Sequence, residues 1–183
     1  GAAIDILINC AGFGGGGPAH EYDPERAVDL VRTNVEGVVA LTALTVPGMA
    51  ERRSGAVVIV SSLAGMLRPP VNFAAYGASK AASLRYAEAL HYELGRLGVA
   101  VLALCPGPVD TGFFTASGLE ATRRATPGFL MASAAECVDA ALDGLERGRP
   151  VVVPKRLVSA VAWVGSRAPK RLSARVLPSL FQV

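Results

Sequence analysis

The residues of this chain best suited to chemistry are Tyr76 and Lys80, in the segment Tyr76-Gly-Ala-Ser-Lys80. They are four positions apart, so on a helix both side chains leave the same face, one turn from each other. An ammonium group beside a phenol stabilises phenolate, so we expect Lys80 to lower the pKa of Tyr76 toward neutral pH. An ordinary amphipathic pair on a helix surface has the same spacing, so the pattern needs support from other segments.

Two serines, Ser61 and Ser62, end the apolar run that precedes this helix. Either hydroxyl could hold an oxygen atom of a bound molecule against the phenol of Tyr76. Either could instead only cap the end of a strand.

The elements that must position these side chains are four short apolar runs separated by helical patterns. The runs are continuously apolar rather than alternating, which is typical of strands covered on both faces. Their alternation with helices predicts a parallel sheet with right-handed crossovers. The four runs are Ile4–Asn9, Ala56–Ser61, Val99–Leu104 and Val151–Val153.

Three helices are expected between and after these strands. Pro24–Met49 reads as one long helix, with Asp23 as N-cap and Pro24 in the first turn. Tyr76–Leu97 is rich in alanine, and Ser133 with Glu136 forms a capping box that opens a helix to about Arg147.

The glycine-rich segment Gly12–Gly17 matches the pattern G-x-G-x-x-G and follows a strand, as a dinucleotide fingerprint does. That fingerprint opens directly into a helix, whose N-terminus faces a pyrophosphate. Here five residues separate Gly17 from Asp23. The spacing favours a flexible loop over a phosphate-binding turn.

Together, Ser62-Leu-Ala-Gly65 and Tyr76-x-x-x-Lys80 resemble the active-site motifs of the short-chain dehydrogenase/reductase family. The resemblance implies an α/β, Rossmann-like, doubly wound parallel sheet in three layers. It also implies an NAD(P)-dependent oxidoreductase that interconverts a carbonyl and a secondary alcohol by hydride transfer. Because the family's serine is followed by x-x-Gly, the resemblance selects Ser62 over Ser61. The implied catalytic set is Asn34, Ser62, Tyr76 and Lys80, with Asn34 holding a water that links Lys80 to solvent.

The resemblance extends to segments that line the cofactor in this family. Asn9-Cys10-Ala11-Gly12 is similar to the family's Asn-Asn-Ala-Gly, with Cys10 in place of the second Asn. Residues 112–130 stand where such enzymes carry a substrate lid, and their phenylalanines favour a small apolar substrate. Related enzymes pair their two long helices across a dimer seam, which implies a homodimer or homotetramer. NAD and NADP are not distinguished, and the expected cofactor-binding residues are Asn9, Cys10, Ala11, Gly12, Tyr76, Lys80, Pro106, Gly107, Val109 and Thr111.

The family also has three strand–helix units before its Asn-Asn-Ala-Gly strand, on the order of 75–90 residues. Here the corresponding strand begins at residue 4. We therefore expect residues 1–153 to be the C-terminal part of a Rossmann-type domain from a longer enzyme, with an apolar strand edge left bare. The alternative is a non-catalytic, oligomerising remnant of the same fold, which would not bind a nicotinamide cofactor.

Composition bounds the remaining possibilities for the 183 residues. Half of the chain is apolar and 18% is charged, which excludes a disordered chain. Three scattered cysteines indicate neither disulfides nor a metal site and favour the reducing cytoplasm. No apolar run reaches the roughly 18 residues of a membrane span.

The net charge of +3 comes from the tail. Six Lys/Arg and no Asp or Glu follow position 154, while residues 1–154 hold 12 basic and 15 acidic side chains. This distribution argues against nucleic-acid binding, which favours a basic groove. Residues 154–183 form a basic C-terminal arm, either packed on protein or, with Trp163 and its apolar neighbours, lying on an anionic membrane surface.

Overall fold

The computed structural model describes residues 3–67, 71–155 and 158. Its centre is a sheet of four parallel strands in the order β1-β2-β3-β4. The strands are β1 (Ile6–Asn9), β2 (Gly55–Val60), β3 (Val99–Leu104) and β4 (Val151–Val152). All four predicted strands are therefore present, and the parallel pairing is confirmed.

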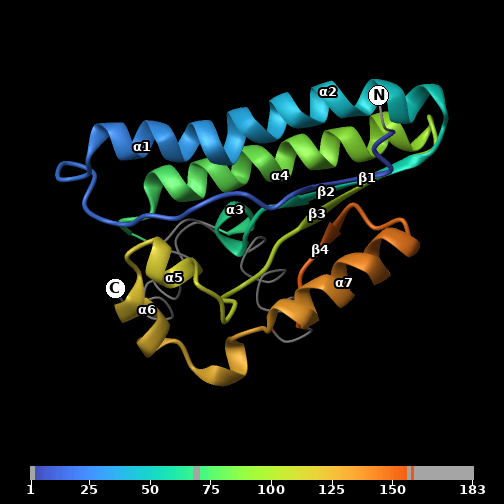
Figure 1. Ribbon diagram of the computed structural model, residues 1–183. Coiled ribbons are helices and arrows are strands. Elements are labelled where there is room, and N and C mark those ends of the chain that lie inside the picture. Colours follow the sequence, from blue (N-terminus) through green and yellow to red (C-terminus); the bar gives the residue numbers. More distant parts are fainter. Residues whose placement is uncertain (1–2, 68–70, 156–157, 159–183) are drawn as a thin grey trace.

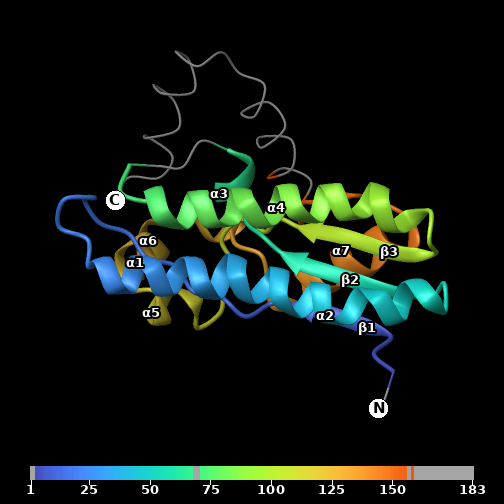
Figure 2. The same ribbon diagram turned by 90° about the horizontal axis from the view of Figure 1, so that it is seen from above.

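One face of the sheet is covered by two long helical segments that lie side by side (Figures 1 and 2). The first is continuous from α1 (Pro24–Val31) through η1 (Arg32–Glu36) to α2 (Gly37–Glu51), and the second is α4 (Ala74–Gly95). Asp23 caps α1 through the amide of Glu25, as predicted. The predicted single helix is thus present, but η1 is a π-helical turn, which the sequence pattern did not indicate.

The opposite face carries α7 (Ala134–Glu146), which begins with the predicted capping box of Ser133 and Glu136. Successive side chains of β2 and β3 point to opposite faces of the sheet, and so pack against different helices. Val57, Ile59 and Val101 pack toward α2 and α4, whereas Leu102 and Leu104 pack toward α7. The three-layer α/β/α architecture is therefore confirmed, as Figure 1 shows.

The three crossovers cannot all have the same hand. Each connects a strand to its next neighbour in the same direction across the sheet, yet α2 and α4 lie on one face and α7 on the other. Reversing the face of a crossover reverses its hand. The prediction of right-handed crossovers throughout is wrong for this reason.

The first strand is also less covered than its sequence suggested. Ile6 and Ile8 are 57% and 61% exposed, because they face the α7 side of the sheet and α7 packs on β2, β3 and β4. β1 pairs with β2 alone among the described strands, which leaves the predicted bare edge.

Short helices complete the described chain. They are α3 (Leu63–Met66), α5 (Phe113–Ala116), α6 (Glu120–Ala125) and the 3-10 turn η2 (Gly128–Leu130). No helix in the described ranges combines the length and apolar character needed to cross a membrane. Except for Pro154, Lys155 and Val158, the predicted basic arm lies outside the described residues.

Candidate active site

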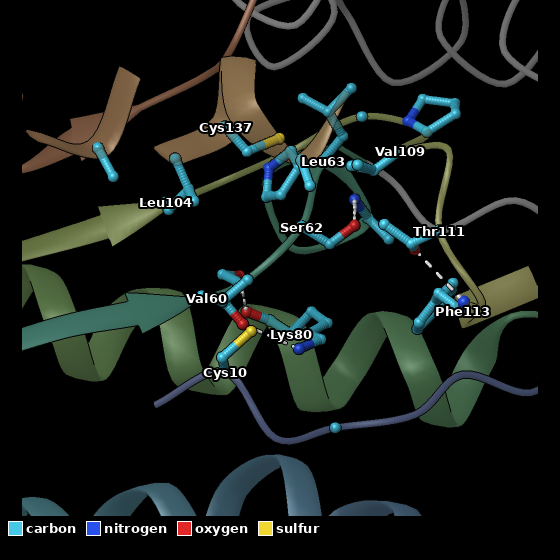
Figure 3. Close-up of a pocket in the computed structure, with 18 of the residues that line it drawn as sticks. Cys10, Val60, Ser62, Leu63, Lys80, Leu104, Val109, Thr111, Phe113 and Cys137 are labelled. Carbon is cyan, nitrogen blue, oxygen red and sulfur yellow. Dashed lines mark hydrogen bonds between the residues drawn. The ribbon is translucent and has the colours of Figure 1, made fainter. Parts of the chain in front are cut away.

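The candidate site lies where the carboxyl ends of β1, β2 and β3 meet. Since the strands are parallel, the segments that follow them emerge at one edge of the sheet. They contribute Cys10, Ser62 and Pro106 to a cavity of about 780 Å³, which is within the usual range for small-molecule sites. Figure 3 shows Cys10, Ser62, Lys80 and Thr111 around this cavity.

Tyr76 and Lys80 stand on the inner face of α4, in its first two turns, and both line the cavity. Both are buried, at 9% and 6% exposure. The Lys80 ammonium donates to the carbonyl of Val60 at 2.9 Å and lies 6.0 Å from the centre of the Tyr76 ring. The structure therefore brings the two residues together on one helix face, as their spacing predicts.

The two serines differ in what they contact. Ser61 is buried and donates to the backbone carbonyl of Lys80 at 2.7 Å, which fixes the end of β2 against α4. Ser62 accepts from the amide of Ala64, capping α3, and its hydroxyl also interacts with the phenol of Tyr76. Ser62, not Ser61, is thus the serine whose hydroxyl stands at the phenol.

Burial determines the proton affinity of this pair. Removal from water raises the pKa of the Tyr76 phenol above its usual value of 10.0, although the hydrogen bond with Ser62 acts in the opposite direction. Burial likewise lowers the pKa of Lys80 from 10.5 to about 8. The pKa of Tyr76 is thus raised, whereas the sequence predicted that Lys80 would lower it. The prediction is wrong because the phenol is buried among aromatic rings and the Lys80 ammonium is directed to the Val60 carbonyl.

Asn34 is almost fully buried within the π turn η1. Its amide nitrogen donates to the carbonyl of Phe13 at 3.0 Å and to the hydroxyl of Ser79 at 3.1 Å, while its oxygen accepts from the Phe13 amide at 3.2 Å. Asn34 therefore ties the glycine-rich segment to α4. It does not line the cavity, so any role toward Lys80 is exerted from behind the cavity wall.

Most of the expected cofactor-side residues do line the cavity. Asn9 and Ala11 do not: the Asn9 amide points into the layer behind and donates to Thr42 of α2 at 3.0 Å. Asn9 is thus a structural tie between β1 and α2. The residues of this set that line the cavity are Cys10, Gly12, Tyr76, Lys80, Pro106, Gly107, Val109 and Thr111.

The glycine-rich segment lacks the geometry of a phosphate-binding turn, since α1 begins only at Pro24. It is also more firmly held than the expected flexible loop. Besides the two bonds from Asn34, the amide of Gly14 donates to Ser117 at 2.9 Å and the amide of Gly17 donates to the carbonyl of Asn72 at 2.9 Å.

Two further aromatic residues, Phe73 and Phe113, line the cavity beside Tyr76, and nothing in the sequence pattern pointed to Phe73. The rings of Phe73 and Phe113 lie 6.4 and 6.0 Å from the Tyr76 ring, centre to centre. Phe113 belongs to the 112–130 segment, whose phenylalanines were expected to favour a small apolar substrate. The cavity wall described by the structure contains one charged side chain, that of Lys80.

Comparison with known proteins agrees with this architecture. The family model of short chain dehydrogenases matches residues 2–121, well over half of the chain. The chain therefore belongs to the short-chain dehydrogenase family.

Curated and solved relatives cover different shares of the chain. Ketoacyl reductase HetN from Nostoc sp. is 37% identical over 107 residues, which are 58% of this chain and 37% of that protein. A short-chain dehydrogenase from Sphingobium yanoikuyae, solved with NADPH, superposes with a TM-score of 0.78 at 28% identity, covering 100% of this chain and 67% of that one. A 3-ketoacyl-(acyl-carrier-protein) reductase from Brucella melitensis, solved with NADH, has a TM-score of 0.72 at 27% identity, covering 81% and 64%. The chain spans less than half the length of the curated relatives it matches.

Proposed function

We propose that this chain carries the catalytic half of an NAD(P)-dependent oxidoreductase that interconverts a carbonyl and a secondary alcohol. The observation that carries the proposal is the convergence of Tyr76, Ser62 and Lys80 on one largely apolar cavity at the carboxyl ends of parallel strands. Relatives of the same fold were solved with NADPH and NADH, which supports a nicotinamide cofactor of either kind.

The donors of the cavity fit the nicotinamide half of such a cofactor. An ammonium and a hydroxyl, from Lys80 and Thr111, stand in a wall that is otherwise mainly apolar, which suits ribose hydroxyls and a flat ring. When bound, the cofactor supplies or accepts the hydride. We assign its contacts to Cys10, Gly12, Tyr76, Lys80, Pro106, Gly107, Val109 and Thr111.

Tyr76 is the general acid in the reducing direction. Since burial raises its pKa, the phenol is protonated at neutral pH and can give its proton to the oxygen of a reduced carbonyl. Ser62 orients that oxygen by a hydrogen bond, and Lys80 holds the cofactor's ribose and restores the proton. Asn34 holds the segment at Phe13 against α4. We also assign to Asn34 the water that connects Lys80 with solvent.

The test is Tyr76→Phe in the purified protein, with NADPH and NADH oxidation followed in the presence of apolar ketones. We expect turnover to be lost while the Kd for the nicotinamide cofactor, measured by calorimetry, changes less than about threefold. Turnover retained by Tyr76→Phe would remove the assignment. A wild-type protein that binds neither cofactor would favour the alternative, a non-catalytic oligomerising domain.

The long helices also support a homo-oligomer. The outer faces of α1, α2 and α4 expose large apolar side chains, with Leu44 81% exposed and Tyr92 68% exposed. Figure 2 shows these helices as one layer across the sheet. A second copy of the chain placed against this layer would bury Val28, Val39, Leu41, Leu44 and Tyr92.

A further inference from the structure

A hydrogen bond joins the glycine-rich segment to the lid segment at Gly14. Its amide donates to the hydroxyl of Ser117 at 2.9 Å, a buried hydrogen bond between residues 103 positions apart. Ser117 is 5% exposed and is the C-cap residue that follows α5. This bond fixes α5 against the segment that follows β1.

Gly14 also has no room for a side chain. A β-carbon there would stand 2.7 Å from Cζ of Phe113 and 3.1 Å from the Ser117 hydroxyl. At Gly16 a β-carbon would touch Phe73 and Leu119 at 3.4 and 3.5 Å. The run of glycines is therefore a flat surface on which the lid packs, and this is the role that its fingerprint-like pattern left unexplained.

The consequence falls on the Phe113 ring. It lies close to both Gly14 and the Tyr76 ring: a β-carbon at Gly14 would meet its Cζ, and the centres of the Phe113 and Tyr76 rings are 6.0 Å apart with planes inclined by 48°. Phe113 also lines the same cavity as Ser62 and Tyr76. Its amide donates to the Thr111 hydroxyl at 3.3 Å, which anchors the start of α5.

We propose that Phe113 is the residue that determines substrate size at this site, and that the Ser117–Gly14 bond positions it. The proposal rests on the proposed function. The substrate class is a carbonyl compound with compact, uncharged apolar substituents, which fit beside Phe73 and Phe113 in a wall whose charged side chain, among the described residues, is Lys80. A larger substituent would meet the Phe113 ring, which cannot retreat past Gly14 without breaking the bond to Ser117.

The experiment compares cyclohexanone with 2-decalone, which carries a second fused ring. In Phe113→Ala we expect kcat/KM for 2-decalone relative to cyclohexanone to rise about tenfold or more, because hydrophobic pockets discriminate by such factors for small changes in volume. Phe129→Ala is the matched control, since that ring lies in the same segment and is 68% exposed. Its ratio should stay at the wild-type value.

Ser117→Ala tests the positioning step. Ser117→Ala should raise kcat/KM for 2-decalone relative to cyclohexanone, by a smaller factor than Phe113→Ala does. The change should appear in KM for 2-decalone, and kcat for cyclohexanone should stay the same. In the double variant, Ser117→Ala should raise this ratio no further than Phe113→Ala alone does. An additive effect would show that Ser117 does not act through Phe113.

A ratio that is unchanged in Phe113→Ala would overturn the proposal, and Phe113→Leu provides the same comparison if the alanine variant does not fold. Calorimetric binding of cyclohexanol and 2-decalol separates this failure from failure of the proposed function. If the wild type turns over neither ketone, the proposed function fails, but the relative Kd values of the two alcohols still test Phe113.

Discussion

Gly65 of α3 lies directly against the backbone of Lys80 in α4. A β-carbon at Gly65 would stand 2.5 Å from the Lys80 carbonyl oxygen and 2.9 Å from the Ala81 nitrogen. Ser61 donates to the same carbonyl. This close approach brings the segment of the two serines against the helix that carries Tyr76 and Lys80.

Gly65→Ala is expected to destabilise the fold by about 2 kcal/mol, since the atoms it meets are backbone and cannot turn aside. Denaturant unfolding measures the change. The Gly65→Ala substitution should also reduce turnover, because it would displace Ser62 from Tyr76. The control is Gly95→Ala, near the end of α4, where a β-carbon meets nothing within 4 Å. That variant should gain about 0.5–1 kcal/mol. Equal effects of the two substitutions would contradict the packing argument.

Asn34→Ala is expected to cost about 3 kcal/mol, because it leaves the amide and carbonyl of Phe13 without the partner they now share. Hydrogen exchange adds a local readout: protection of the Phe13 amide should fall far more than protection in β3. Thr45→Ala removes an exposed hydroxyl from α2 and should change stability by less than about 0.5 kcal/mol. Unchanged exchange at Phe13 would show that Asn34 does not hold this segment.

Lys80 makes stability depend on pH in a defined window. Its pKa falls from 10.5 to about 8 on folding, so between these values the unfolded chain binds more protons than the folded one. The free energy of unfolding contributed by this group therefore rises from pH 8 to 10.5, by about 3 kcal/mol at most. As pH falls from 10.5 to 8 the contribution is lost, because Lys80 is then protonated in both states.

Lys80→Met should abolish this rise. Measuring the unfolding free energy of both proteins across the alkaline range isolates the effect, because Tyr76 titrates in both and cancels in the difference. A difference that is independent of pH would show that Lys80 keeps its ordinary pKa.

Leu44→Glu tests the proposed homo-oligomer. Leu44 is 81% exposed, so the substitution should leave the fold of one subunit intact. A charge buried between two copies would oppose association, and sedimentation velocity should show a shift toward the monomer. Glu51→Gln, at the exposed end of α2, serves as control. Association unaffected by Leu44→Glu would place the interface elsewhere or remove it.

Local signals in the sequence predicted most of the elements. Asp23-Pro24 and Ser133 with Glu136 satisfy the free amides of a helix start, so they mark α1 and α7 without knowledge of the fold. The spacing of Tyr76 and Lys80 likewise follows from helix geometry alone. These features depend on neighbours within one or two turns, which is why they could be read from the chain.

The remaining features depend on contacts between distant segments. The π turn holds Asn34 in bonds to Phe13 and Ser79, and neither partner is visible in the pattern around it. The exposure of Ile6 and Ile8 depends on where α7 packs. The pKa of Tyr76 depends on burial beside Phe73, at the N-cap of α4, and Phe113, in α5. This burial reverses the direction inferred from Lys80 alone.

The π turn has a consequence for how this chain can vary in length. It holds one residue more than an α-helical turn, and its wider turn takes up that residue. Five residues of π-helix therefore advance the chain around the axis by about as much as four residues of α-helix, so α1 and α2 keep the phase of one continuous helix. For this reason Leu30 packs in the aromatic cluster while Val38 packs against the sheet. Deleting one residue within Arg32–Glu36 would restore α-helical winding without turning α2 against α1, and the change would fall on Asn34 and its bonds to Phe13 and Ser79. The turn is therefore a place where the helix can lose one residue without disturbing the packing on either side of it.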